Sequence, residues 1–297
     1  MTQDSLSENL YVVSNGLDEL SVISSDFKVA RQFSVGESPM VPALTPDGKY
    51  LLVTSRDSRS VCVLDPASLE RVTDIDVERG AAGIAVSPDG ARAYVANEFA
   101  DTVSVIDLRT LRVIATVRVG QGPCMVAIPK DGRFVAVSNE VSGDLALIDP
   151  RSFEVRMTPR ILMAPVGLCL SPDGAEAFVA DYFSNRVVVF DTRSWRLKET
   201  FRVGTRHVGI ALAGGGRQIY VTNVDSSSVS VIDLGSGKCA GEIECGDSPA
   251  YIAISACGAR AAISNQGSND VAILELNTKR IIGRIDVGLS PLGAVYA

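Results

Sequence analysis

The sequence has 297 residues, 46% of them hydrophobic and 21% charged, and 35 Asp and Glu against 28 Lys and Arg give a formal net charge of −7. An acidic chain without an extended Lys/Arg cluster lacks the field that draws proteins to phosphate backbones, so we expect no nucleic-acid partner. No stretch approaches the ~18 consecutive apolar residues of a membrane span, so we also expect no membrane association and a cytoplasmic protein.

Taken in chain order, the first segment is Met1 to Asn9, which is polar and acidic and lacks the basic and apolar regions of a signal peptide. We expect this segment, residues 1–9, to be a tail. The rest of the chain, residues 10–297, shows no linker or low-complexity break and is predicted to form a single domain.

One repeat runs through that domain. A position that is usually glycine after valine recurs every 42 residues, at 36, 78, 120, 162, 204, 246 and 288. Within one repeat the apolar pattern is that of short strands, as in Ile84 to Ser87, Ala93 to Asn97, Val103 to Asp107 and Val113 to Val119. Pro-Asp-Gly turns such as Pro88-Asp89-Gly90 precede the second strand of a repeat. Four short strands in about 40 residues, seven times over, are typical of a β-propeller.

The ends of the domain hold partial repeats that complement each other. The first strand, Leu10 to Asn15, corresponds to the second strand of a repeat, and the last, Leu292 to Ala297, corresponds to a first strand. We therefore predict an all-β, seven-bladed propeller of four-stranded antiparallel blades, closed by one C-terminal strand that joins three N-terminal ones.

Several strings in these strands match a known family. Tyr220-Val221-Thr222-Asn223 and its variant Tyr94-Val95-Ala96-Asn97 are followed by Val-Ser-Val-Ile-Asp, at Val229 to Asp233 and Val103 to Asp107. With the Ser-Pro-Asp-Gly turns, this combination resembles the YVTN-repeat, or lactonase-like, seven-bladed β-propeller family over residues 10–297. The resemblance implies the fold; its members include lactonases, lyases, dehydrogenase subunits and binding proteins, so it implies no single activity.

Two sets of loops are expected to build the upper mouth of the central channel. The first set follows Gly36 and its equivalents, and five of its seven members carry proline at the third position, where His207 is one exception. The next residue in each loop is apolar, and these residues either border the mouth or pack between blades: Met40, Ala82, Cys124, Val166, Val208, Ala250 and Leu292. If they border it, the pocket favours an apolar small molecule.

The second set of loops differs between repeats at one aligned position. An asymmetric ligand would require such variation, and solvent-exposed loops without a function would also vary in this way. That position holds Arg56, Glu98, Glu140, Tyr182, Val224 and Gln266. Glu98 and Glu140 come from adjacent blades, and two close carboxylates can act as an acid/base pair. His207 is the only histidine and is expected to carry a proton at the mouth, oriented by Glu98 or Glu140.

Other chemistry is missing from the sequence. Six cysteines without a Cys-x-x-Cys pair, and a single histidine, predict neither a zinc site nor a redox dithiol. The chain has no phosphate-binding glycine loop and no Gly-x-Ser-x-Gly elbow, so we expect no bound cofactor and no resident metal. A calcium or magnesium site built only from carboxylates stays open.

Together these features predict a monomeric, cofactor-free enzyme that performs acid/base chemistry (cyclisation, isomerisation or elimination) on a largely apolar small molecule at the upper mouth. The candidate residues are catalytic His207, Glu98 and Glu140, anion-holding Arg56, Arg79 and Arg206, and substrate-binding Met40, Cys124, Met125, Tyr182, Phe183, Tyr251 and Gln266. Two alternatives remain open: a non-enzymatic scaffold that binds a ligand or a protein, and a lactone hydrolase or metal-assisted lyase.

Overall fold

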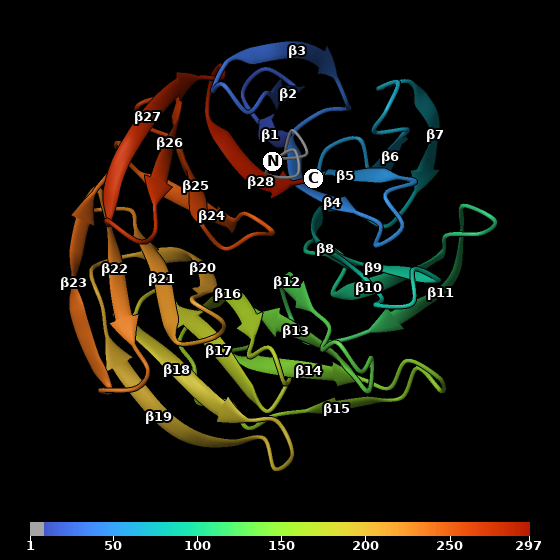
Figure 1. Ribbon diagram of the computed structural model, residues 1–297. Coiled ribbons are helices and arrows are strands. Elements are labelled where there is room, and N and C mark those ends of the chain that lie inside the picture. The colour runs from blue at the N-terminus through green and yellow to red at the C-terminus, as the bar shows by residue number, and fades with distance from the viewer. Residues whose placement is uncertain (1–8) are drawn as a thin grey trace, which may run out of the picture.

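The computed structural model describes residues 9–297, which form a ring of seven four-stranded sheets without a helix (Figure 1). The predicted all-β, seven-bladed propeller is confirmed. We call the sheets blades 1 to 7: blade 1 has the strand order β28-β1-β2-β3, blade 2 is β4 to β7, and so on to blade 7, β24 to β27. Of the predicted tail, residues 1–8 lie outside the described residues.

Every blade has the same four strand positions, from the ring axis outward. In the order of blades 1 to 7, the innermost strands are β28 (Pro291–Tyr296), β4 (Pro39–Leu44), β8 (Ala81–Val86), β12 (Pro123–Ala127), β16 (Pro165–Leu170), β20 (His207–Ala213) and β24 (Pro249–Ile254). The second strands are β1 (Leu10–Ser14), β5 (Leu51–Ser55), β9 (Arg92–Asn97), β13 (Val135–Asn139), β17 (Glu176–Asp181), β21 (Gln218–Asn223) and β25 (Arg260–Asn265). The third strands are β2 (Glu19–Ile23), β6 (Ser60–Leu64), β10 (Thr102–Asp107), β14 (Asp144–Ile148), β18 (Arg186–Asp191), β22 (Ser228–Asp233) and β26 (Asp270–Glu275). The outermost strands are β3 (Val29–Ser34), β7 (Arg71–Asp76), β11 (Arg112–Arg118), β15 (Val155–Met157), β19 (Arg196–Arg202), β23 (Lys238–Glu244) and β27 (Arg280–Asp286).

Burial along the strands follows the stacking of the blades. Every residue of β5, β6 and β13 is buried, whereas most of β7 is exposed. Both faces of the middle strands are covered by neighbouring blades, so these strands are apolar almost throughout rather than alternating. The core is accordingly divided into seven apolar clusters, each between two adjacent blades. This packing gives the loops at the mouth a rigid support.

The ring is closed within blade 1 by strands from the two ends of the chain. β28 pairs antiparallel with β1, with Leu10 opposite Tyr296 and Val12 opposite Ala294. The N–H of Ala297 donates to the carbonyl of Asn9 at 2.8 Å. Figure 1 shows β28 beside β1 at the centre of the ring. The pairing covers the inner edge of β1 and gives blade 1 the same four strands as the other blades.

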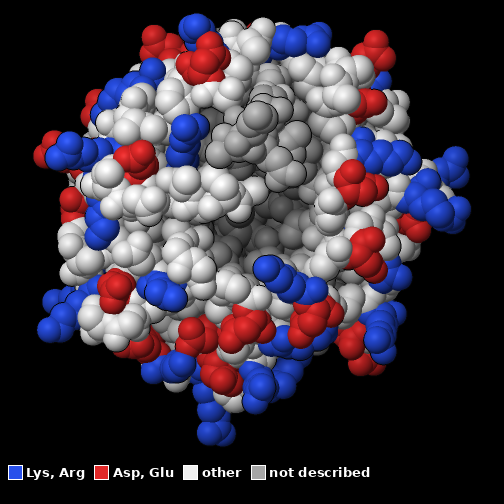
Figure 2. Space-filling view, in the orientation of Figure 1, with Lys and Arg blue, Asp and Glu red and all other residues white. Residues whose placement is uncertain are grey.

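The centre of the ring is narrow because neighbouring inner strands approach backbone to backbone. A Cβ on Gly83 would lie 2.4 Å from the carbonyl oxygen of Cys124, and one on Gly293 would lie 2.3 Å from that of Met40. A side chain at either position would force the inner strands apart. In the space-filling view the ring is hollowed at its centre, and charges of both signs surround it (Figure 2).

None of the elements in residues 9–297 is a helix with the length and hydrophobicity that a membrane crossing needs.

Candidate functional site: a cavity on the ring axis

A cavity of about 260 Å³ lies where the inner strands begin, and residues from every blade line it. The seven apolar residues at the starts of these strands all border it: Met40, Ala82, Cys124, Val166, Val208, Ala250 and Leu292. Of the two alternatives for this set, the structure therefore shows the first. The cavity is slightly smaller than the ~300–1,000 Å³ of most ligand pockets, so its size suits a compact molecule.

Hydroxyl groups on the second strands hold this apolar lining in place. The inner strands shift register just after they begin, which removes a backbone N–H from the ladder. Thr54 replaces the lost partner: its Oγ1 accepts from the N–H of Val41 at 3.1 Å and donates to the carbonyl of Ala82, in the next blade, at 2.6 Å. Ser138 makes the same bridge to the carbonyl of Val166 at 2.9 Å. These bonds tie the lining of one blade to that of the next.

The polar side of the cavity comes from the repeat-breaking position after the second strand. Its backbone has the same role in six blades, because the N–H donates to a carbonyl of the preceding mouth loop, at 3.0 Å from Arg56 and 2.8 Å from Glu98 and Glu140. With the backbone held, the side chain alone differs between blades. Arg56, Glu98, Glu140 and Tyr182 line the cavity, and all of its charged lining comes from blades 2, 3 and 4.

Arg56 and Glu98 form an ion pair across two blades, with Nη2 2.9 Å from Oε2. Both side chains are largely buried, 31% and 19% exposed. Desolvation raises the pKa of Glu98, opposed by the charge of Arg56 and reinforced by that of Glu140. Arg56 also lies over the ring of Phe99 at 5.6 Å. The contact between Nη2 and Oε2 is an ion pair without hydrogen-bond geometry. Arg56 Nε and Glu98 Oε2 therefore have no hydrogen-bond partner in the described part of the chain.

Glu140 is the second carboxylate of the cavity, and its described hydrogen-bond donor is a thiol. The Sγ of Cys124 lies 3.8 Å from Oε2 of Glu140. Burial raises the pKa of the Cys124 thiol, and the charges of Glu140 and Glu98 raise it further, so the thiol stays protonated. On the far side of the cavity, burial raises the pKa of the Tyr251 hydroxyl to about 12. One guanidinium and two carboxylates therefore meet in an otherwise apolar enclosure.

His207 does not belong to this cavity, which corrects the sequence-based expectation. Its ring is buried, and Nε2 bonds the carbonyl of Arg186, in the neighbouring blade, at 2.7 Å. Burial lowers the pKa of the imidazole below its usual 6.5. The histidine occupies the slot that proline fills in five other loops, and this slot faces the interface between blades 5 and 6 rather than the axis. Its neighbour Val208 lines the cavity instead.

Four other candidates also lie outside the cavity lining. Phe183 is 59% exposed and packs edge-on against Tyr182, with ring centroids 4.8 Å apart. Arg79 is exposed and donates to the carbonyl of Phe99. Arg206 is half exposed and pairs with an aspartate at the rim, and Gln266 is half-buried. The remaining eight candidates border the cavity: Arg56, Glu98, Glu140, Met40, Cys124, Met125, Tyr182 and Tyr251.

Sequence reasoning did not select several of the lining residues. Val41 and Gly83 occupy the next position along the inner strand, which is glycine in four blades and large in the others, at Val41, Met125 and Tyr251. The occurrence of large side chains at a position that is otherwise glycine could have identified these residues from the sequence. In residues 9–297 no cluster of three or more His, Cys, Asp or Glu side chains could hold a metal ion.

Comparisons with known proteins agree on the fold. A family model described as YNCE-like beta-propeller matches residues 81–210, which include Glu98, Cys124, Glu140 and Tyr182. Among curated proteins no significant match is found.

Solved structures resemble the chain at low identity. Hydrazine synthase of Kuenenia stuttgartiensis superposes with a TM-score of 0.83 and 21% identity, covering 90% of this chain and 92% of that one. A protein of unknown function from Desulfotomaculum acetoxidans gives a TM-score of 0.85 and 17% identity over 98% of both chains. The dihydro-heme d1 dehydrogenase NirN, solved in complex with DHE, gives a TM-score of 0.73 and 17% identity. The match covers 97% of this chain and 65% of the NirN chain. At these identities the likeness extends to the propeller fold alone.

Proposed function

We propose that the axial cavity is the active site of an enzyme that binds a compact, largely apolar molecule and moves a proton on it. The observation that carries this proposal is the burial of Glu98 beside Glu140 in an apolar enclosure. A carboxyl with a raised pKa is an efficient proton donor near neutral pH, and a second carboxylate within the same cavity is available as the acceptor.

The residues divide this work in a simple way. The fraction of Glu98 that is protonated donates a proton to one atom of the substrate and Glu140 takes one from another atom, so the two exchange protonation states in one isomerisation. Arg56 limits how far the pKa of Glu98 rises, because its positive charge favours the carboxylate. The seven apolar residues bind the carbon skeleton and exclude water. Cyclisation and elimination fit the same arrangement.

The proton transfer can be tested without knowing the natural substrate. Compact apolar molecules that carry a carbonyl or hydroxyl group are screened by thermal shift, and the binders are incubated with the protein in D₂O. NMR then follows exchange of ligand C–H for deuterium and any chemical conversion. We expect Glu98→Gln to slow exchange by at least ~10²-fold while it preserves binding. Glu37→Gln, at an exposed mouth-loop glutamate outside the cavity, is the matched control.

Two outcomes count against an enzyme. Ligands that bind the wild type but show neither exchange nor conversion would indicate a non-enzymatic binding protein. Binding unaffected by Val166→Trp, which fills the cavity, would place the ligand elsewhere.

We also propose that the chain is a member of the YVTN-repeat, lactonase-like family. Tyr220-Val221-Thr222-Asn223 and the 42-residue repeat support this membership. Determination of propeller structures with higher sequence identity to this chain would test it, through the presence or absence of the same strings at the second strands.

A further inference from the structure

A second and larger cavity, of about 620 Å³, lies between blades 3 and 4 at the opposite ends of their strands from the axial cavity. Its walls are the two turns that lead into β9 and β13, residues 87–92 and 128–132, together with Pro150 and Arg151 after β14. These turns join first to second strands, whereas the mouth loops lie at the other strand ends. The cavity is therefore independent of the proposed active site.

The hydroxyl of Tyr94 faces this cavity and lacks a protein partner among the described residues. The residue is 1% exposed and lines the cavity. Two other blades carry tyrosine at the same strand position, and there the hydroxyl is bonded. Tyr11 donates to the carbonyl of Pro66 at 3.3 Å, and Tyr220 donates to Gln218 at 3.1 Å. The Tyr94 hydroxyl therefore keeps an open hydrogen-bonding position at the cavity wall, where solvent or a ligand can reach it.

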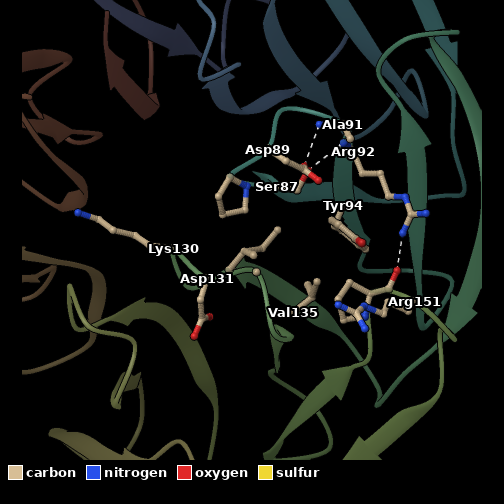
Figure 3. Close-up of a pocket in the computed structure, with 13 residues that line it drawn as sticks. Ser87, Asp89, Ala91, Arg92, Tyr94, Lys130, Asp131, Val135 and Arg151 are labelled. Carbon is tan, nitrogen blue, oxygen red and sulfur yellow. Dashed lines mark hydrogen bonds between the residues drawn. The ribbon is translucent and has the colours of Figure 1, made fainter.

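Arg92 accounts for the free hydroxyl. The carbonyl of Pro150 corresponds to that of Pro66, the acceptor used by Tyr11, but in this blade Arg92 Nη1 donates to it instead. The guanidinium of Arg92 also lies over the ring of Phe153 at 5.3 Å. The arginine is thus held at the cavity wall and occupies the carbonyl that corresponds to the partner of Tyr11. Figure 3 shows Arg92 and Arg151 at the end of the cavity toward which the Tyr94 hydroxyl points.

Three cationic side chains, those of Arg92, Lys130 and Arg151, and two carboxylates, those of Asp89 and Asp131, line the cavity. Asp89 accepts from the Ser87 hydroxyl at 2.6 Å and from the N–H of Ala91 at 3.0 Å. Asp131 pairs with Arg133 at 2.5 Å. Arg151, in contrast, is exposed at the cavity with no described ion pair. Lys130 lines the other side and extends away from the arginines (Figure 3).

We propose that this cavity binds a small molecule through an oxyanion group, a phosphate or a carboxylate. The oxyanion accepts hydrogen bonds from the Tyr94 hydroxyl and from Arg92 and Arg151, whose planar guanidinium groups suit both anions. Pro88 and Ile128 supply apolar surface for the body of the ligand.

The experiment is titration calorimetry of the full-length protein with inorganic phosphate and with succinate, each against chloride at equal ionic strength. Tyr94→Phe removes only the hydroxyl, and Arg151→Gln removes one surface cation. Their controls are Tyr220→Phe, the equivalent tyrosine whose hydroxyl is bonded to Gln218, and Arg193→Gln, the residue equivalent to Arg151 in blade 5. Melting temperatures of all variants verify folding, and Arg151→Gln keeps the test valid if Tyr94→Phe is unstable.

We expect saturable binding of at least one anion, weakened at least tenfold by Tyr94→Phe and by Arg151→Gln and unchanged in both controls. Tighter binding of phosphate or of succinate then identifies the oxyanion. The proposal is overturned if neither anion binds saturably, or if binding depends on Arg151 but not on Tyr94 in a folded Tyr94→Phe variant, since that result describes only a charged surface.

Discussion

The ion pair of the axial cavity offers the sharpest test of its electrostatics. Replacing Arg56 with methionine removes the positive charge and keeps much of the side-chain volume. At a separation of 2.9 Å and an effective dielectric constant of 20, Coulomb's law gives about 6 kcal/mol of attraction to Glu98. Because the side chains are still 31% and 19% exposed, solvent screening and desolvation offset most of that attraction. We expect a net coupling of about 1–2 kcal/mol.

The assay is urea unfolding of the wild type, Arg56→Met, Glu98→Gln and the double variant at pH 8. We expect Arg56→Met to cost about 2 kcal/mol, because it leaves Glu98 and Glu140 in an apolar enclosure without a cation. In the double variant the loss should be smaller than the sum of the single losses. Additivity to within about 0.5 kcal/mol would refute the coupling. Arg79→Met, at the exposed mouth arginine, should change stability by less than about 0.5 kcal/mol.

The same variants predict a pH dependence with a definite sign. The pKa of Glu98 is raised in the folded chain, so its contribution to stability is present at low pH and is lost as the pH rises through the folded pKa. Arg56→Met raises that pKa further, because the charge of Arg56 lowers it. The cost of Arg56→Met should therefore shrink at pH 4 and grow toward pH 8. A cost independent of pH would contradict this assignment.

Three more outcomes follow from the geometry. Burial lowers the pKa of His207, so on acidification the unfolded chain takes up a proton at this residue before the folded chain does. The melting temperature of the wild type should therefore fall as the pH drops below about 6.5, and the fall should be smaller in His207→Asn. Gly293→Ala places a Cβ 2.3 Å from the carbonyl of Met40 and should cost about 1–3 kcal/mol in urea unfolding; an unchanged midpoint would mean that the inner strands can move apart. The raised pKa of Cys124 should make it at least tenfold slower to alkylate with iodoacetamide at pH 7.5 than exposed Cys239, as peptide mass spectrometry would measure, and equal rates would contradict the raised pKa.

The repeat alone was enough to predict the architecture. The sequence repeats every 42 residues, and each repeat has four apolar segments that form one sheet. Such a sheet can bury its apolar faces only against neighbouring sheets, and seven of them close a ring. The landmarks at the strand ends also located the mouth loops, because turn residues at constant spacing divide every blade into the same elements. Eight of the thirteen candidate residues accordingly border the axial cavity. Their functional roles stay predictions.

Side-chain direction was decided only by the tertiary structure. His207 and Val208 are adjacent in sequence, but His207 bonds a carbonyl of the neighbouring blade whereas Val208 borders the cavity. The repeat located the loop that contains them without assigning the face of each residue.

The pairing of charges was also invisible in the sequence. Arg56 and Glu98 are 42 residues apart, and only the closing of the ring brings them to 2.9 Å. The free hydroxyl of Tyr94 depends on competition for one carbonyl between two side chains of the same strand, which no pattern of residue types records. Local composition determined which elements form and how often they recur. Contacts between blades, which depend on the curvature of the closed ring, determined which of those residues can share a ligand.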